Sequence, residues 1–144
     1  MTNETLLQIM KRCKIKNGIE LVPGEAYLFH QNFFIPIDDD VERVKEEIEI
    51  IILTHKGKKV GCIYRMEWYD IHVLIKEKYR GRHFMSNFLK KGIIEEIWKE
   101  NKSTDLCDVD SWETFNKKKY LANLCHMTIR NEKEIIRDLK NKYY

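Results

Sequence analysis

DIHVLIKEKYRGRHFMSNFLKKGIIEEIW, residues 70–98, is the segment around which this chain is organised. An apolar strand over 71–76 runs through a basic turn that contains Gly81 and then directly into an amphipathic helix. Such a turn aims several backbone N–H groups at one point, beside arginines and at the positive end of a helix. The segment therefore predicts a site for phosphate or pyrophosphate, and hence a phosphorylated cofactor.

Length and composition predict one globular domain. The chain has 144 residues, of which 43% are hydrophobic, enough for one sizeable core and too few for two ordinary domains. We therefore expect a single domain over residues 1–144. The formal net charge is +3, which is smaller than the excess of basic residues typical of a nucleic-acid-binding protein. The cysteines show no metal-ligand spacing, and no leader segment or membrane span is recognisable, so a reduced, cytoplasmic protein with no metal site is expected.

Upstream of the basic turn, the sequence predicts a helix, a strand, a second short helix and then three strands. Residues 3–13 indicate an amphipathic helix capped by Thr2 or Asn3. A turn at Pro23-Gly24 precedes a strand over 26–35 that Pro36 closes. The acidic triplet 38–40 favours the start of a short helix over a metal site. Strands over 48–55 and 59–68 flank the turn Lys56-Gly57-Lys58, and a third strand over 71–76 follows.

Downstream of the turn, helices dominate the prediction. Leu89, Ile93 and Ile97 are four residues apart, which indicates one helix with a face packed on the sheet. Gly92 on that face would permit close approach. The remaining predicted elements are a strand over 104–110, a helix over 113–125, a strand over 127–130 and a helix that Asn131 caps and that runs to residue 140. This order indicates a mixed α/β (α+β) fold.

The sequence VLIKEKYRGR at 73–82, followed by an apolar helix, resembles the V-x-P-x-Y-R-G-x-G-I-G segment of the GNAT superfamily of acyl-CoA-dependent N-acetyltransferases. The motif resemblance covers about residues 71–98, and the order of elements extends it over most of the chain. It implies a central mixed, mostly antiparallel sheet flanked by helices, and acetyl-CoA as cofactor. Three positions depart from the family pattern: Glu77 replaces proline, His83 replaces glycine, and Met85 replaces glycine or alanine.

The resemblance also implies which residues contact the cofactor. Backbone N–H groups of the loop from Arg80 onward would hold the pyrophosphate, and the backbone near Ile75 would bind the thioester carbonyl. Asn116 would contact the pantetheine arm, with a helix-surface asparagine as the alternative. The full set of implied cofactor-binding residues is Val73, Leu74, Ile75, Arg80, Gly81, Arg82, His83, Phe84, Met85, Ser86 and Asn116.

The acid that protonates the departing thiolate is, in the family, often a tyrosine of the helix after the fifth strand. Counted back from Cys125-His126-Met127, which resembles the family's L-G-F ending of that helix, this position falls at Ala122. Tyr120 is the nearest phenol, although two residues along a helix turn it roughly 200° away. Tyr120 is therefore a candidate acid, and its alternative role is an amphipathic surface residue.

Base candidates cluster where the strand over 59–68 turns into the strand over 71–76. Glu67, Asp70 and His72 would each lie near the acceptor end of the cofactor, where a base must remove a proton from the attacking amine. Their alternative roles are charges at a hairpin end and a structural strand histidine.

The leading functional prediction is an acetyl-CoA-dependent N-acetyltransferase that acts on a primary amine of a small molecule, a peptide or a protein by direct attack on the thioester. An alternative is a non-catalytic binding or scaffold protein that kept the fold, as His83, Met85 and Ala122 indicate. A basic nucleic-acid module built on Lys117-Lys118-Lys119 with Arg80 and Arg82 is disfavoured by the charge balance. No nucleic-acid or membrane partner is expected, and a homodimer is left open.

Overall fold

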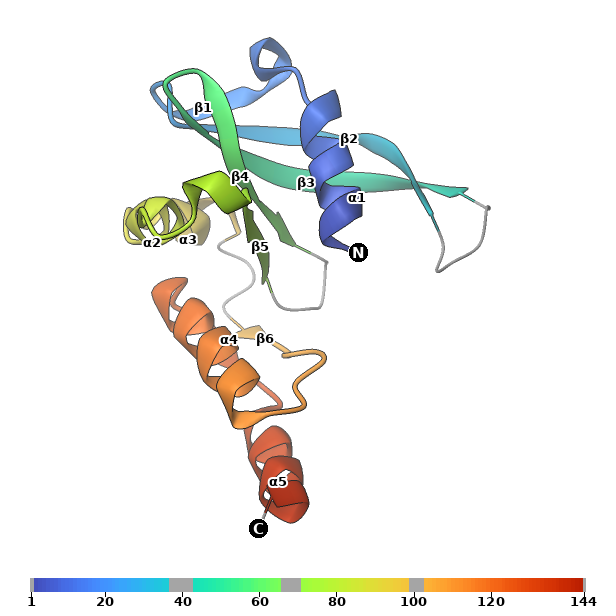
Figure 1. The fold of residues 1–144 in the computed structure, drawn as a ribbon, viewed down its shortest axis with the longest axis vertical. Helices are drawn as coiled ribbons and strands as arrows, with labels where there is room; N and C mark the ends of the chain where they lie inside the picture. The colour runs from blue at the N-terminus through green and yellow to red at the C-terminus, as the bar shows by residue number, and fades with distance from the viewer. Residues whose placement is uncertain (1, 37–42, 66–70, 99–102, 144) are drawn as a thin grey trace. The chain divides into compact units, whose positions relative to one another are not determined.

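The computed structural model describes four stretches of the chain, residues 2–36, 43–65, 71–98 and 103–143 (Figure 1). Their contacts group into two compact units. The first unit consists of Met1–Tyr64 and His72–Arg82, and the second of Arg65–Ile71 and His83–Tyr144. The predicted mixture of helices and strands is present in both, but the expected central mixed sheet is not: the described strands form one five-stranded antiparallel sheet and a separate two-stranded parallel sheet.

The first unit is built on a five-stranded antiparallel sheet whose strands follow one another in chain order. The strands are β1 (Ile19–Val22), β2 (Ala26–Pro36), β3 (Arg43–His55), β4 (Lys58–Arg65) and β5 (Ile71–Ile75). Two of the predicted turns are confirmed. Lys56 and Gly57, with φ of 52° and 76°, form the two-residue turn between β3 and β4 that right-handed strand twist favours. Glu25 N donates to Val22 O at 3.0 Å across Pro23-Gly24.

Helix α1 (Asn3–Arg12) covers one face of this sheet (Figure 1). Of the two predicted caps, Thr2 is the one used, because its hydroxyl accepts from Thr5 N at 3.2 Å. The helix buries its apolar stripe against alternate residues of β2, β3 and β4, since strand side chains on one face recur every second residue. The residues of this core are Leu6, Ile9, Met10, Cys13, Phe29, Ile48, Ile50, Ile52, Cys62, Tyr64 and Leu74.

Lys59 anchors the C-terminal end of α1 to the sheet. Its ammonium donates to the backbone carbonyls of Met10 and Cys13, two acceptors that the helix itself leaves without partners. A cation at this end also suits the helix dipole. The β3–β4 hairpin is thereby tied to α1 by a charged hydrogen-bonding group that the sequence pattern did not single out.

The two strands of this hairpin differ in their bounds from the prediction. β3 begins at Arg43, five residues before the expected start at Ile48, because its pairing with β2 extends from Ala26↔Leu53 to Pro36↔Arg43. The helix predicted to start at 38–40 lies outside the described residues. β4 ends at Arg65, and the rest of the strand predicted over 59–68 also lies outside them.

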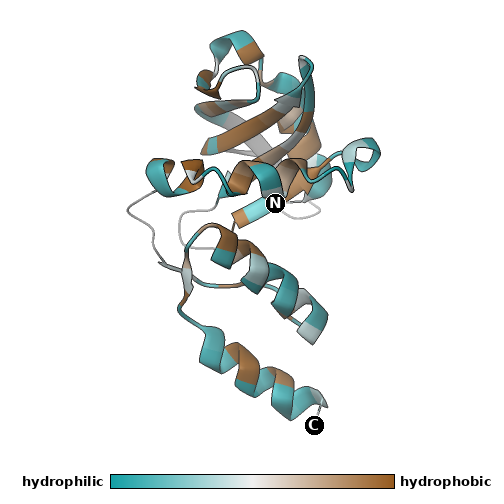
Figure 2. Ribbon diagram, turned by 90° about the vertical axis from the view of Figure 1, so that its left-hand side faces the viewer, coloured by the Kyte–Doolittle hydropathy of each residue, from teal (hydrophilic) through white to brown (hydrophobic). Residues whose placement is uncertain are grey.

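The second unit is mainly helical. Its elements are α2 (Phe84–Leu89), α3 (Ile93–Ile97), β6 (Ser103–Thr104), α4 (Trp112–Leu124), β7 (Thr128–Ile129) and α5 (Glu132–Tyr143). Figure 2 shows both polar and apolar residues on its two long helices, α4 and α5. β6 and β7 pair in parallel, with α4 as their connection.

The single helix predicted after the basic turn is wrong. Gly92 has φ of +74° and separates α2 from α3, since a left-handed residue cannot continue a right-handed helix. A Cβ at Gly92 would meet nothing within 4 Å, so this glycine provides backbone freedom and not the predicted close approach. The break also shifts the buried stripe, which consists of Phe88, Leu89, Ile94 and Trp98 and leaves Ile93 and Ile97 half-buried.

The strand predicted over 104–110 is confirmed only at its start. Beyond Thr104, the backbone of Leu106 bonds to a side chain: Asn131 Oδ1 accepts from Leu106 N and Asn131 Nδ2 donates to Leu106 O, both at 3.0 Å. Asp108 then adopts φ of +55°, which ends extended structure. Asn131 was predicted to cap the last helix; it lies directly before α5, and its amide bonds to Leu106, which ties that helix to the 105–110 loop.

Candidate functional site

The basic turn leaves β5 in a defined conformation. A 3-10 turn over Glu77–Tyr79 follows the strand, with Tyr79 N donating to Lys76 O at 2.9 Å. The guanidinium of Arg80 reaches back, and its Nε donates to Ile75 O at 3.0 Å. Gly81 has φ of +78°, and a Cβ there would meet nothing within 4 Å. Glycine is therefore favoured at this position because it adopts the left-handed backbone conformation without strain, and not because a larger side chain would clash with its surroundings.

His83 follows with a backbone conformation that is uncommon for a residue other than glycine. Its φ is +62°, in the left-handed region that non-glycine residues occupy at a cost of about 1 kcal/mol. Its carbonyl accepts from Asn87 N at 2.9 Å and from the hydroxyl of Ser86 at 3.3 Å. The predicted loop residues Phe84, Met85 and Ser86 form the first turn of α2, where each is half-buried.

The predicted thioester-binding backbone lies in β5, the last strand of the sheet. Lys76 N donates to Val60 O of β4 at 2.9 Å. Because consecutive residues of a strand direct their N–H groups to opposite sides, the N–H and C=O of Ile75 face away from β4. The bond from Arg80 to Ile75 O is on that outer side. Of the side chains in this strand, Leu74 is buried in the core, whereas Val73 and Ile75 are half-buried.

Gly61 lets β4 and β5 approach closely. A Cβ at this position would lie 2.4 Å from Leu74 O and 2.6 Å from Ile75 Cδ1, which are separations that real Cβ atoms do not adopt. The backbone at Leu74 and Ile75 is therefore positioned by the absence of a side chain on the neighbouring strand. The sequence prediction did not single out this glycine, although a glycine inside an apolar strand is the signal for such an approach.

Of the three predicted base candidates, the structure describes His72. Its Nε2 lies 3.0 Å from Asn3 Oδ1 at the start of α1, and the ring is half-buried. Glu67 and Asp70 lie outside the described residues, so their predicted clustering with His72 stays a prediction.

Helix α4 separates the two candidates for the acid position. Ser111 caps the helix by accepting from Thr114 N at 3.1 Å. Ala122 is buried, whereas Tyr120 is 58% exposed. Asn116, the predicted pantetheine contact, is also exposed. The phenol therefore points away from the side of α4 on which Ala122 lies, as the helical period requires.

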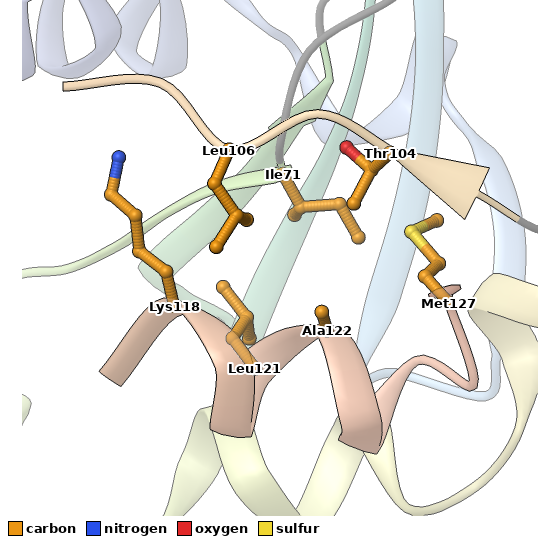
Figure 3. Close-up of a pocket in the computed structure, with 7 residues that line it drawn as sticks. All are labelled: Ile71, Thr104, Leu106, Lys118, Leu121, Ala122 and Met127. Carbon is orange, nitrogen blue, oxygen red and sulfur yellow. The ribbon is translucent and has the colours of Figure 1, made fainter. Parts of the chain in front are cut away.

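Ala122 lines a shallow hollow in the second unit (Figure 3). Its volume is about 240 Å³ when the open space at its mouth is included. The seven residues that line it are Ile71, Thr104, Leu106, Lys118, Leu121, Ala122 and Met127. Most of these side chains are apolar, and the ammonium of Lys118 donates to Cys107 O at one side. Ala122 keeps this space open, because a bulky side chain at that position would project into it (Figure 3).

A second histidine with a left-handed backbone conformation, His126, lies just beyond the end of α4. His126 has φ of +54°, and the next residue, Met127, donates its N–H back to Ala122 O at 2.9 Å. This is the geometry with which helices commonly terminate, usually at glycine. His126 Nε2 also lies 3.1 Å from Glu95 Oε1 of α3.

The buried cysteines are unsuited to nucleophilic chemistry. Burial raises the pKa of Cys62 to about 12 and that of Cys125 to about 12. Burial also raises the pKa of Cys13 to about 11, against a smaller opposing effect of the Lys59 ammonium. Since the thiolate is the reactive form, these three side chains behave as small apolar core residues at neutral pH.

Comparisons with known proteins identify no family for this chain. A scan against protein-family models, a search of curated proteins and a search of solved structures each gave no match. Within the described residues, no group of three or more His, Cys, Asp or Glu side chains is arranged to hold a metal ion. None of the helices in the described part of the chain has the length and apolar character needed to cross a membrane.

Proposed function

We propose that the protein is an acyl-CoA-dependent N-acetyltransferase with a GNAT-like fold, in which the turn from Arg80 onward holds the cofactor's pyrophosphate. The observation that carries this proposal is the backbone at His83 and His126. Both residues stand where the family resemblance implies glycine, and both have left-handed φ, of 62° and 54°. Residues other than glycine adopt this conformation only at a cost in free energy, which the surrounding fold has to offset.

The arrangement of elements supports the same proposal. Antiparallel strands β2, β3 and β4 precede β5, and β5 leads through Gly81, with φ of +78°, into α2. A second strand–helix–strand unit, β6–α4–β7, follows. This is the order that the resemblance implies, and the left-handed backbone at residue 81 also falls where the motif has glycine.

The proposed chemistry requires few side chains. A neutral amine attacks the thioester carbonyl, and the developing oxyanion needs a backbone donor held in place beforehand. The N–H of Ile75 is our candidate, because it faces away from β4 and Gly61 fixes its strand at close distance. His72 is the described candidate for the base that takes the amine proton.

A second candidate function is a non-catalytic acyl-CoA-binding protein of the same fold. The specific observation in its favour is Ala122, a buried residue without a titratable group at the position where the resemblance places the acid. Tyr120 does not replace it from the same side of α4, since its ring is 58% exposed.

Titration calorimetry with acetyl-CoA and with CoA tests the proposal without knowledge of the acceptor. We expect binding in the micromolar range, loss of binding in Gly81→Val, and only a modest effect of Arg82→Lys, which keeps the charge. Gly24→Val is the matched control. Gly24 also has positive φ, +69°, and open space, so it carries the same backbone cost in a turn of the first unit remote in sequence from the proposed loop.

The outcomes separate the two candidates. Binding that Gly81→Val abolishes and Gly24→Val preserves supports the cofactor site, and turnover in a subsequent screen of amines then establishes the transferase. Binding without transfer to any amine favours the non-catalytic alternative. No binding at millimolar ligand, or equal effects of the two glycine variants, refutes the proposed site.

A further inference from the structure

Cationic side chains of the first unit concentrate in three short segments, residues 11–16, 56–59 and 76–82. Eleven of the 26 basic residues of the chain lie in these segments, together with one of its 23 acidic residues, Glu77. The eleven are Lys11, Arg12, Lys14, Lys16, Lys56, Lys58, Lys59, Lys76, Lys78, Arg80 and Arg82. Since the rest of the chain is left with fifteen basic and twenty-two acidic residues, the near balance of the whole sequence conceals a strong segregation of charge.

The fold brings the first two segments together. The ammonium of Lys59 donates to the backbone carbonyls of Met10 and Cys13, which holds the end of α1 beside the turn between β3 and β4. Residues 11–16 therefore lie next to residues 56–59, although 46 positions separate Cys13 from Lys59. All cationic side chains of these two segments are exposed except that of Lys59, which is half-buried.

The third segment joins them at the end of β5. Lys76 N donates to Val60 O of β4 at 2.9 Å, so residues 76–82 leave the sheet beside the same turn. The pKa of Lys59 is lowered mainly by burial, against an opposing effect of Cys13, and the ammonium of Lys76 adds to the lowering. Lys76 is half-buried, and the other three cations of this segment are exposed. We call the three segments together the basic surface.

The charges of the basic surface repel one another, which lowers the stability of the folded state. The same concentration of charge creates a positive potential that attracts anions, most strongly those with many charges in a row. The net charge of +3, from which no nucleic-acid partner was expected, averages this surface with the acidic remainder of the chain. A polyanion meets the local charge and not the average.

We infer that the basic surface binds the phosphate backbone of a single-stranded nucleic acid. This inference goes beyond the proposed function and does not depend on it. Lysines and arginines that neutralise phosphates release condensed counterions, which provides affinity without sequence recognition. The half-buried ring of Tyr79, with the Lys78 ammonium at 5.1 Å and the Arg82 guanidinium at 5.7 Å from its centroid, adds a position on which an unpaired base can stack.

The composition of the basic surface distinguishes this partner from a membrane. In these three segments, all of which the structure describes, none of the large hydrophobic side chains is exposed. Peripheral binding to a bilayer combines cations with exposed apolar side chains that enter the lipid. Cations on their own, with one aromatic ring among them, suit a polyphosphate chain in water.

Fluorescence anisotropy with labelled, mixed-sequence single-stranded DNA and RNA tests the inference as a function of salt. We expect micromolar binding at about 50 mM salt, and a plot of log K against log salt with a slope of about −0.7 for each phosphate contact. Lys14→Gln with Lys16→Gln, and Lys56→Gln with Lys58→Gln, each remove two cations outside the proposed pyrophosphate loop. Each pair should reduce the magnitude of the slope by about 1.4 and weaken binding about tenfold or more at low salt.

Lys133→Gln with Lys140→Gln is the matched control, because it removes the same charge from exposed positions on α5. The control should leave the slope unchanged. Tyr79→Leu should weaken binding about fivefold through the lost stacking contact and also leave the slope unchanged. Acetyl-CoA binding should be the same in the Lys14/Lys16 and Lys56/Lys58 variants as in the wild type, so the two proposals succeed or fail separately. Circular dichroism of each variant verifies folding.

Several results would overturn the inference. No binding at about 50 mM salt, a slope near zero, or equal losses in the control and in the variants of the basic surface each remove it. Equal affinity for poly-glutamate assigns the surface to acidic polymers in general, and binding to phosphatidylserine vesicles without binding to the oligonucleotides assigns it to a membrane. Unchanged binding by Tyr79→Leu, or tighter binding of a duplex of the same sequence, refutes the assignment to single strands.

Discussion

Substitution of Gly61 by alanine should separate β4 from β5 and destabilise the first unit. The new Cβ would lie 2.4 Å from Leu74 O, about 1 Å inside the closest comfortable contact. Since Leu74 O is a backbone atom, no rotamer change relieves the clash, and the strands must move apart. The hydrogen bond from Lys76 N to Val60 O, 2.9 Å long, spans the same pair of strands and would be stretched toward breakage.

The magnitude follows from three contributions. Overpacking costs about 1–3 kcal/mol, and a weakened backbone hydrogen bond adds about 1 kcal/mol. Alanine restricts the unfolded chain and returns about 0.5–1 kcal/mol. The net expectation is a loss of about 2 kcal/mol in the free energy of unfolding, which lowers the urea midpoint by about 1 M for a slope of about 2 kcal/mol/M.

Urea unfolding monitored by circular dichroism measures this loss, and amide exchange at Lys76 locates it. Gly24→Ala is the control for backbone strain alone, because its φ is +69° and a Cβ there meets nothing within 4 Å. That variant should cost about 1 kcal/mol and leave exchange at Lys76 unchanged. If Gly61→Ala stays within about 0.5 kcal/mol of the wild type with normal protection of the Lys76 amide, the close approach of β4 and β5 does not exist.

Other substitutions test the anchoring of α1, the strained turn and the buried thiols. Lys59→Met keeps the apolar stem but leaves two carbonyls of α1 without their donor, and should cost about 2 kcal/mol in urea unfolding; no loss would show that these bonds are unimportant. His83→Gly relieves left-handed strain and should raise the thermal midpoint, by the equivalent of about 0.5 kcal/mol, whereas a lower midpoint would contradict the φ at that residue. Burial raises the pKa of Cys62 from 9.0 to about 12, so the folded state keeps a proton that the unfolded chain loses. Stability should therefore fall as pH rises from 9 toward 12, with a smaller fall in Cys62→Ala. Cys107, the half-buried thiol, should react first with a thiol reagent in the native protein, and mass spectrometry of labelled peptides identifies the site.

Much of the first unit could be predicted from local sequence signals. The Lys56-Gly57 turn, the Pro23-Gly24 turn and the capping of α1 by Thr2 each depend on the conformational preferences of a few consecutive residues. β5 and the basic turn that follows it were predicted in the same way. The observed bounds of β5, Ile71–Ile75, agree with the predicted strand over 71–76 to within one residue.

Predictions failed where the decisive partner was distant in sequence or the backbone departed from a regular period. The apolar spacing of 89, 93 and 97 indicated one helix, but Gly92, with φ of +74°, divides it and shifts the buried stripe. Asn131 was recognised as preceding the last helix, while its bonds to Leu106, 25 positions earlier, could not be anticipated. Ala122 was singled out by the resemblance, but the hollow around it also needs residues distant in sequence, among them Ile71, Thr104 and Leu106.

The sequence by itself determined most of the helices and strands, the positions of the tight turns, and the basic, glycine-bearing loop on which the proposed cofactor site depends. These features follow from short-range sterics, capping and the period of apolar residues, all of which act within a few residues of the chain. The tertiary structure alone decided that Gly61 brings β4 against β5, that Lys59 holds the end of α1, and that Ala122 opens a hollow while Tyr120 faces solvent. Each of these depends on groups that only folding brings together, because close packing and burial are properties of the assembled core and not of any local segment.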